Sequence, residues 1–240
     1  MLLGAVLPAA VSAQVVAPGE SGVSMGHFHL NTQDSATQQK FWNEIAGAQD
    51  AKMGPMQVSK LPGVLVLFTK AEPKGGTEGS VVDHIGFRVT GLKSILSKAE
   101  AAHIQILKHD DKSAMLLAPD GIRVALIEDS AMTQPVAIGF SSDHPEDMKK
   151  WYAATFGATI PGVSLHFASA ATAPAGTKGR ALDHIGFEVK NLEEFANKLA
   201  ASGVKFNVPY RKIPSLGIAI AFFTDPWGTY IELTEGLDKI

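Results

Sequence analysis

The stretch VVDHIGFRV at residues 81–89 returns as ALDHIGFEV at residues 181–189, 100 positions later. Ordered self-similarity of this kind indicates an internal duplication and determines the architecture. Further segments match in the same order: FWNEIAGA (41–48) with WYAATFGA (151–158), LPGVLVLF (61–68) with IPGVSLHF (160–167), and PDGIRVALIE (119–128) with PWGTYIELTE (226–235). The chain therefore consists of two related halves, joined near residues 133–135.

Each half divides again into two modules. In every module a short apolar strand precedes an amphipathic helix, and strands separated by Gly and Pro follow. The first helix is expected to begin at Asp34 as N-cap and to stop at Gly47. The fourth is expected to begin at Asn191, with Glu194 three residues later as in a capping box, and to stop at Gly203.

The third module is shorter than the first. Residues 157–161 leave no room for the strand that residues 52–59 could form in the first module. The pattern predicts an α+β fold built from four βαβββ modules. We expect these modules to form two domains, at residues 24–130 and 134–238.

Composition excludes several classes of function. Apolar residues make up 45% and charged residues 19% of the 240 positions, which is typical of a folded soluble protein. The formal charge is −3 and no run of Lys and Arg appears, so nucleic acid is not the expected partner. The absence of cysteine rules out disulfides and thiol catalysis.

The first thirteen residues, MLLGAVLPAAVSA, resemble a signal peptide that ends in small residues. The run is too short to span a bilayer, and no membrane partner is expected. The segment predicts a periplasmic or secreted protein. A cytoplasmic protein with an apolar N-terminus is the alternative.

Histidines recur in the opening strands. Because side chains alternate along a strand, His27 and His29 share one face in the first module. His84 stands in the opening strand of the second module and His184 at the matching place of the fourth. A lone strand histidine is often only a hydrogen-bonded structural residue, but this repetition favours a binding role.

Other modules lack polar residues at matching places. Ala137 and Gly139 stand in the third module where the first has histidines. The last strand of the fourth module carries Glu232, whereas the second module has Ala125 there. Glu128 cannot substitute for the missing carboxylate, because it lies on the opposite face of an alternating strand.

Two imidazoles and one carboxylate that point into a sheet-lined cleft can hold a divalent metal and leave positions open for substrate. Such ligands suit Fe, Mn, Co, Ni or Zn, and nothing in the sequence selects among them. The sequence therefore predicts a divalent metal ion as cofactor.

Three segments carry a family resemblance: HFHLNTQDSATQQKFW (27–42), DHIGFEVKNLEEFANKLAASGV (183–204) and DPWGTYIEL (225–233). They resemble the vicinal oxygen chelate (VOC) superfamily, which includes glyoxalase I, extradiol dioxygenases, and fosfomycin- and bleomycin-resistance proteins. The resemblance covers about residues 25–237. It implies that paired modules curl into half-barrels around a metal. Histidines of the opening strands and a glutamate of the final strand would be the ligands.

Carried onto this sequence, the ligand positions are His27, His84, His184 and Glu232. If modules pair in chain order, the second cleft holds His184 and Glu232, and His166 could complete it. If the first module pairs with the fourth, one cleft gathers His27, His184 and Glu232, and the other keeps His84 with His166. We predict a metal centre that contains His184 and Glu232, with either His27 or His166 as third ligand.

Four residues have further expected roles. Glu232 could shuttle a proton as well as bind metal, and His29 is a second polar residue that could act in catalysis. Tyr210 and Arg211 lie near the expected mouth of the cleft, where they could bind an anionic substrate or fasten a loop.

The resemblance implies a glyoxalase-like lyase or isomerase that acts on a small substrate with vicinal oxygens. An extradiol-type dioxygenase and a non-catalytic small-molecule binding protein with a degenerate metal site are the alternatives. Four modules in one chain already make the assembly that two-module relatives reach by dimerising. Both a monomer and a homodimer are therefore compatible with the sequence.

Overall fold

The computed structural model describes residues 15–129 and 135–239. The expected signal peptide at residues 1–13 lies outside these ranges, so export stays a prediction. The first module contains β1 (Val23–Thr32), α1 (Ser35–Glu44), β2 (Gln49–Met53), β3 (Met56–Leu61) and β4 (Val64–Lys70). The second contains β5 (Val82–Val89), α2 (Leu92–Ala101), β6 (Gln105–His109), β7 (Ser113–Ala118), the short 3₁₀ helix η1 (Pro119–Gly121) and β8 (Ile122–Glu128).

The third module contains β9 (Val136–Ser142), α3 (Pro145–Phe156) and β10 (Val163–Ser169). The fourth contains β11 (Leu182–Val189), α4 (Leu192–Ala201), β12 (Phe206–Ile213), β13 (Ile218–Thr224) and β14 (Tyr230–Glu235), followed by η2 (Leu237–Lys239). The third module is shortened as predicted. The single strand expected at residues 52–59 was wrong, because the chain turns at Gly54, where φ is +59°, and forms the β2–β3 hairpin.

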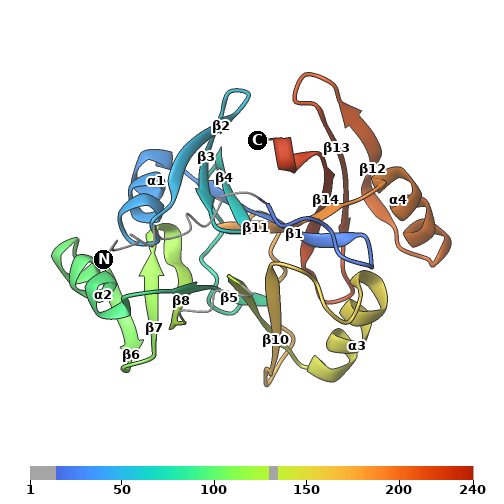
Figure 1. The fold of residues 1–240 in the computed structure, drawn as a ribbon. Coiled ribbons are helices and arrows are strands. Elements are labelled where there is room, and N and C mark those ends of the chain that lie inside the picture. The colour runs from blue at the N-terminus through green and yellow to red at the C-terminus, as the bar shows by residue number, and fades with distance from the viewer. Residues whose placement is uncertain (1–14, 130–134, 240) are drawn as a thin grey trace, which may run out of the picture.

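The strands form two sheets, and each sheet combines modules from both halves. The first and fourth modules make an eight-stranded sheet in the order β12-β13-β14-β11-β1-β4-β3-β2. The second and third make a six-stranded sheet in the order β10-β9-β5-β8-β7-β6. At the centre of each sheet two opening strands run antiparallel, β1 beside β11 and β5 beside β9. The first module therefore pairs with the fourth (Figure 1).

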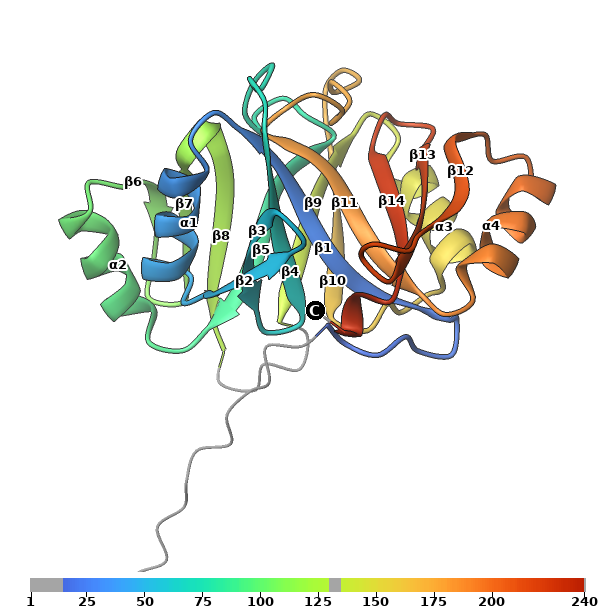
Figure 2. The same ribbon diagram turned by 90° about the horizontal axis from the view of Figure 1, so that it is seen from above.

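The segments 24–130 and 134–238 consequently each supply strands to both sheets. Whether they act as separate domains stays a prediction. Helices α1 and α2 lie at one end of the molecule and α3 and α4 at the other, with the sheets running between the ends (Figures 1 and 2). No helix in the described ranges is long and apolar enough to cross a membrane.

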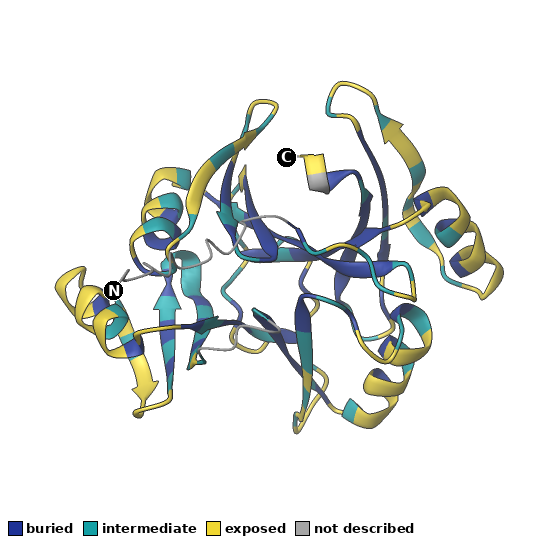
Figure 3. Cartoon of the chain, viewed as in Figure 1, coloured by how far each residue is buried: buried dark blue, intermediate teal, exposed yellow. Residues whose placement is uncertain are grey.

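The core lies between the two sheets and under the helices. Phe28 of β1 and Phe87 of β5 are buried, and their ring centroids are 6.3 Å apart, so the sheets meet back to back at these strands. Burial is concentrated on the strands, whereas the outer helix surfaces are exposed (Figure 3). Because side chains alternate along β1, His27 and His29 point away from Phe28 and from the second sheet.

Helix α1 begins as the sequence predicts. The side chain of Asp34 accepts hydrogen bonds from the backbone N–H groups of Ala36 (3.1 Å) and Thr37 (3.0 Å). Such a cap supplies acceptors for N–H groups that have no partner within the helix. Gly47 follows the helix with φ of +73°, a left-handed conformation that suits glycine.

The capping box expected at the start of α4 was wrong. Asn191 adopts a left-handed conformation, and its side chain makes no cap hydrogen bond. The N–H of Leu192 donates instead to Glu235 of the neighbouring strand β14, at 2.9 Å. Glu128 of β8 accepts from the first N–H groups of α2 in the same way. A carboxylate at a helix N-terminus is favourable, and here it comes from a strand distant in sequence.

Candidate metal centre

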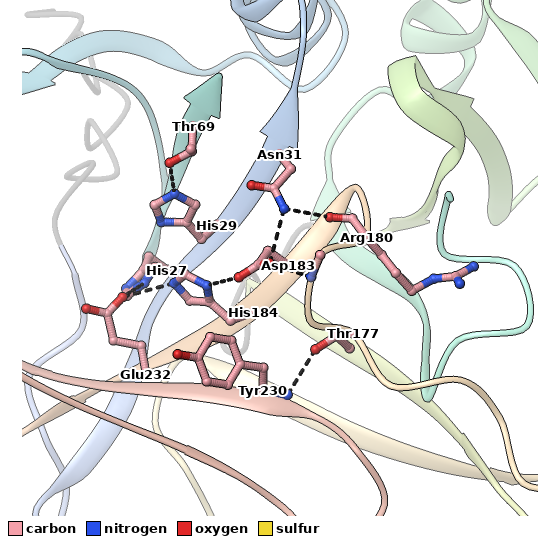
Figure 4. Close-up of polar contacts among 11 residues, drawn as sticks. His27, His29, Asn31, Thr69, Thr177, Arg180, Asp183, His184, Tyr230 and Glu232 are labelled. Carbon is pink, nitrogen blue, oxygen red and sulfur yellow. Dashed lines mark hydrogen bonds and ion pairs between the residues drawn. The ribbon is translucent and has the colours of Figure 1, made fainter. Parts of the chain in front are cut away.

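Four polar side chains meet on the inner face of the eight-stranded sheet (Figure 4). His27 and His29 come from β1, His184 from β11 and Glu232 from β14. One nitrogen or oxygen atom from each lies within 4.8 Å of those of the others. Strand register explains the meeting, because His29 lies directly opposite His184, and Glu232 sits beside Gly186, which is opposite His27.

Gly186 leaves room for the ring of His27. A Cβ atom at position 186 would lie 2.0 Å from Cε1 of that ring, so only glycine allows the ring to lie across β11. In this position His27 Nε2 is 2.9 Å from Glu232 Oε2. The glycine of the repeated DHIGF segment thus brings the first histidine to the carboxylate.

Glu232 is the centre of the cluster. Its Oε2 atom accepts hydrogen bonds from Nε2 of His27 at 2.9 Å and from Nε2 of His184 at 3.0 Å. All three residues are buried, and an unpaired buried carboxylate would be costly. Burial opposes ionisation, but the hydrogen bonds to His184 and His27 outweigh it and hold the pKa of Glu232 well below its usual range. The carboxylate therefore stays ionised.

His184 is held from its other side by Asp183. The Nδ1 atom of His184 donates to Asp183 Oδ1 at 2.7 Å, and Asp183 Oδ2 accepts from Asn31 (3.1 Å) and from the backbone of Gly179 (2.6 Å). Burial lowers the pKa of His184, but Asp183 and Glu232 more than offset it, so this pKa lies above its usual value. A carboxylate on Nδ1 keeps Nε2 directed at the cluster.

His29 is the fourth member. Its ring centroid is 4.5 Å from that of His184, and its Nε2 lies 2.7 Å from the hydroxyl of Thr69. Burial, together with the nearby charges of His184 and His27, lowers the pKa of His29 to about 3. At neutral pH this imidazole is therefore uncharged, which suits a metal ligand better than a base.

Apolar residues close one end of the cleft. Leu65 of β4 lies beside His27 in the strand register, and Leu67 beside His29. Both leucines are buried against Leu237 of η2. The C-terminal turn thus covers the apolar side of the cluster and limits the space available to a ligand.

Aromatic residues flank the other side. The ring centroids of Phe222 and Tyr230 lie 5.3 Å and 5.7 Å from that of His184, and these two rings stack on each other at 5.3 Å. The ammonium group of Lys178 lies 4.3 Å from the centre of the Tyr230 ring. Burial, with the charges of Asp183 and Glu232, raises the pKa of the Tyr230 hydroxyl, which therefore stays protonated at neutral pH.

The donor atoms fit a divalent transition metal. Ligand atoms about 2.1 Å from one ion lie roughly 3.0 to 3.4 Å apart, close to the 2.9 and 3.0 Å between the histidine nitrogens and Glu232 Oε2. Imidazole and carboxylate donors suit Zn, Ni, Co, Mn or Fe. His27, His184 and Glu232 could hold such an ion, and His29 could add a fourth donor.

Comparisons with known proteins identify the family of this chain. The sequence profile of the Glyoxalase/Bleomycin resistance protein/Dioxygenase superfamily matches residues 24–233. The chain belongs to this superfamily. A comparison with curated proteins finds no match.

Solved structures share the fold. Glyoxalase I from Zea mays aligns with a TM-score of 0.70 at 15% identity, covering 90% of this chain and 94% of that one. A candidate dioxygenase from Bacillus subtilis aligns with a TM-score of 0.66 at 13% identity, covering 88% and 84%. The predicted α+β fold with two half-barrels of this superfamily is confirmed.

The other half-barrel of this superfamily fold holds the remaining predicted ligands. His84 of β5 lies opposite Gly139 of β9, which in turn lies beside His166 of β10. Ala125 and Ala137 occupy the places that the glutamate and the first histidine take in the eight-stranded sheet. The structure therefore does not bring His84 or His166 to the four-residue cluster. It leaves His27, not His166, beside His184 and Glu232.

The predicted substrate-binding pair lies on β12, away from the cluster. Tyr210 and Lys212 face α4, where they line a cavity of about 810 Å³ together with Glu193 and Asn197. Arg211 is exposed on the opposite face of this edge strand, which is the face that carries the cluster, because it pairs with Ile220 and Ile220 shares a face with Phe222. A role for Tyr210 and Arg211 in substrate binding stays a prediction.

Two residues of the site, Asp183 and Tyr230, were not predicted from the sequence. Asp183 forms an Asp–His pair with His184, and the same pair recurs as Asp83–His84, a repeated signal that could have revealed it. Tyr230 precedes Glu232 by two residues on an alternating strand, which places both on one face. Both residues could have been predicted from the sequence without knowing which modules pair.

Proposed function

We propose that this chain is a metal-dependent enzyme of glyoxalase type, a lyase or isomerase that acts on a small substrate with vicinal oxygens. The observation that carries the proposal is the convergence of three imidazoles and one carboxylate from β1, β11 and β14 inside a half-barrel of this superfamily. A divalent cation bound there would act as a Lewis acid on the substrate oxygens.

The protein residues would divide the remaining tasks. The Nε2 atoms of His27 and His184 and the Oε2 atom of Glu232 would hold the cation, with His29 as additional donor. Both hydrogen bonds to Glu232 use Oε2, so its Oε1 atom is the one available to take a proton from the substrate and return it. Leu237 would exclude water from one side.

The glyoxalase-type proposal can be tested by loading and assay. The metal-free protein would be titrated calorimetrically with Ni²⁺, Zn²⁺, Co²⁺ and Mn²⁺, and with Fe²⁺ without oxygen. The loaded forms would then be assayed for isomerisation of 2-oxoaldehyde–thiol adducts. We expect one equivalent of metal per chain and metal-dependent turnover.

Two histidine variants provide a matched pair. His184→Ala should lose most of the metal affinity, whereas His84→Ala, at the same place of the other sheet, should keep it. A protein that takes up no metal, or that loses it equally in both variants, would contradict the proposed centre.

An extradiol-type dioxygenase is the second candidate. Two histidines and a carboxylate are also the ligand set of non-haem Fe(II) oxygenases, and His29 would supply a further polar group beside the metal. Oxygen uptake by the Fe²⁺-loaded protein with a catechol would favour this reaction over isomerisation.

The third candidate is a protein that binds a small molecule without catalysis. The six-stranded sheet, with alanines in place of two ligands, shows that a half-barrel of this chain exists without a complete ligand set. Metal uptake without turnover of either substrate class would favour this candidate.

A further inference from the structure

We propose that Tyr230 is a substrate-positioning residue whose hydroxyl donates a hydrogen bond to an oxygen of a planar, anionic substrate at the metal centre. This inference rests on the proposed function, because it requires a ligand at the cluster of His27, His29, His184 and Glu232. Nothing in the sequence pattern or in the fold alone assigns a role to this tyrosine.

Strand register places Tyr230 at the cluster. β14 runs parallel to β11 with Ile231 beside Ile185, so Tyr230 and Glu232 lie on one face and Tyr230 comes next to His184. In Figure 4 the Tyr230 ring lies beside the cluster, and its hydroxyl is at the end of the ring nearer to Glu232. The phenol is therefore directed toward the space where a ligand would bind.

Two contacts hold the ring in this orientation. Phe222 stacks against it with an interplanar angle of 28°, and the Lys178 ammonium lies 4.3 Å from its centre. Both contacts use the faces of the ring and leave its hydroxyl edge free. A cation over the ring is attracted to its π-electrons, which helps to hold the ring in this orientation.

The hydroxyl of Tyr230 has no hydrogen-bond partner among residues 15–129 and 135–239. Tyr230 is only 8% exposed, and a buried tyrosine hydroxyl usually finds a partner. Tyr152 shows the usual case, since its hydroxyl donates to Asp225 at 2.9 Å. The Tyr230 oxygen is also not among the fully enclosed atoms that lack a partner, so it is in contact with solvent.

The position also indicates how the ligand approaches. Tyr230, His184 and His29 follow one another across β14, β11 and β1, and Tyr230 is at the end of this row away from Leu67, which packs with Leu237. A substrate entering there would meet the Phe222 and Tyr230 rings and the positive charge of Lys178. This combination fits a planar ligand with negatively charged vicinal oxygens, and a catechol is a stable probe with these features.

The test uses 4-nitrocatechol, a coloured compound with two vicinal oxygens, on the Co²⁺-loaded protein. Tyr230→Phe removes only the hydroxyl and keeps the ring that stacks on Phe222. Loss of one hydrogen bond should weaken probe binding by about 5- to 10-fold. Tyr152→Phe, which removes a tyrosine hydroxyl that donates to Asp225 instead, should leave probe binding unchanged.

Four further measurements make the result decisive. Calorimetry should show the same Co²⁺ affinity in Tyr230→Phe as in the unmodified protein, and the thermal unfolding midpoint checks that the variant folds. Lys178 is exposed, and Lys178→Met should weaken probe binding by about 2-fold, in the same direction as Tyr230→Phe. The absorption spectrum of bound probe should change in Tyr230→Phe, because the donor to its oxygen is gone.

The outcomes separate this inference from the proposed function. If the unmodified protein binds no metal, both fail. If it binds metal but Tyr230→Phe and Lys178→Met bind the probe as tightly as the unmodified protein, only the role of Tyr230 is overturned. Loss of Co²⁺ affinity in Tyr230→Phe would also overturn it, since the tyrosine would then support the cluster and not the substrate.

Discussion

The eight-stranded and six-stranded sheets have the same arrangement of central strands, but only the eight-stranded sheet carries the cluster of His27, His29, His184 and Glu232. In the first, His27 of β1 lies opposite Gly186 of β11. In the second, Ala137 of β9 lies opposite Gly86 of β5 in the same antiparallel register. A glycine thus stands at this place in both sheets, but only Gly186 has a histidine ring across it. In the six-stranded sheet the ring of His84 lies across Gly139 of β9 instead.

The closing strands differ in the same way. β14 places Glu232 beside the glycine of β11, whereas β8 places Ala125 beside the glycine of β5. Both sheets keep the Asp–His pair, as Asp183–His184 and as Asp83–His84. The strand geometry is therefore retained where the ligand set is incomplete.

The comparison shows that the fold does not require the cluster. Burying imidazoles and a carboxylate is costly unless they are paired, and the six-stranded sheet forms with small apolar residues at those places. A cluster that the backbone arrangement can do without is what the proposed binding role predicts. The following experiments test this difference between the sheets.

The largest effect is expected at the central carboxylate. Glu232→Gln keeps the shape but removes the charge, and because loss of supporting partners alone costs about 10- to 100-fold, loss of this ligand should weaken metal binding by at least about 100-fold. Glu128→Gln, on the closing strand of the other sheet, caps α2 and should leave metal affinity unchanged in calorimetry. Equal affinity in the unmodified protein and Glu232→Gln would remove Glu232 from the centre.

Restoring the missing residues should create a second site. The double variant Ala137→His, Ala125→Glu would place a ring over Gly86 and a carboxylate beside it, next to His84. We expect a second equivalent of Co²⁺, bound about 10- to 100-fold more weakly because Gly139 stands where the first site has His29. If the variant folds and still binds a single equivalent, matched register is not sufficient for a site.

Alanine at the two central glycines should have unequal effects. In Gly186→Ala the new Cβ atom meets the His27 ring at 2.0 Å, so the ring must move. We expect the free energy of unfolding to fall by about 1–3 kcal/mol and metal affinity to fall with it. In Gly86→Ala the nearest atom is the Ala137 Cβ at 3.1 Å, so urea unfolding should show a smaller loss and metal binding none.

The Asp–His pairs offer a finer comparison. Asp183→Asn removes the charge that orients His184 and should weaken metal binding by about 10-fold. Asp83→Asn makes the same change beside His84 and should not alter metal binding. The ring NH signal of His184 in nuclear magnetic resonance spectra should shift in the first variant only. Equal metal affinities in the two variants would mean that Asp183 has no supporting role.

The smallest expected effect is the pH dependence of the metal-free protein. The lowered pKa of Glu232 gives stability that is present above the usual value of 4.5 and lost as pH falls. The raised pKa of His184 gives stability that is present below 6.5 and lost as pH rises. The difference in unfolding free energy between the unmodified protein and Glu232→Gln should therefore be largest between these values, on the order of 1 kcal/mol. A difference that does not vary with pH would contradict the ionised pair.

Much of the fold follows from local patterns. The repeated DHIGF segments, the short third module and the Asp34 cap depend on neighbouring residues, and the sequence therefore predicts them correctly. The position at which α4 starts, after Asn191, was predicted correctly, but its capping box was not, because the acceptor, Glu235, lies 43 positions from Leu192. Caps supplied by another strand leave no signal at the helix itself.

The pairing of modules is the part that sequence could not settle. Either pairing buries the same apolar faces, so alternation along a strand is satisfied in both. The choice between His27 and His166 as neighbour of His184 depended on that pairing, and only the strand order of the eight-stranded sheet decides it. The pairing also explains why one histidine of β1, His27, and one of β11, His184, contact the same carboxylate.

The exchange of strands between halves has a consequence for how this protein can be divided. A cut before β9 would give two fragments. The first would retain β1 and β5 but lack β11 and β9, their central neighbours. His27 would lie in the first fragment and Glu232 in the second. We therefore expect metal binding only when the two fragments are mixed and associate. In this respect the two halves of the chain correspond to the two subunits of a heterodimer joined by a peptide linker.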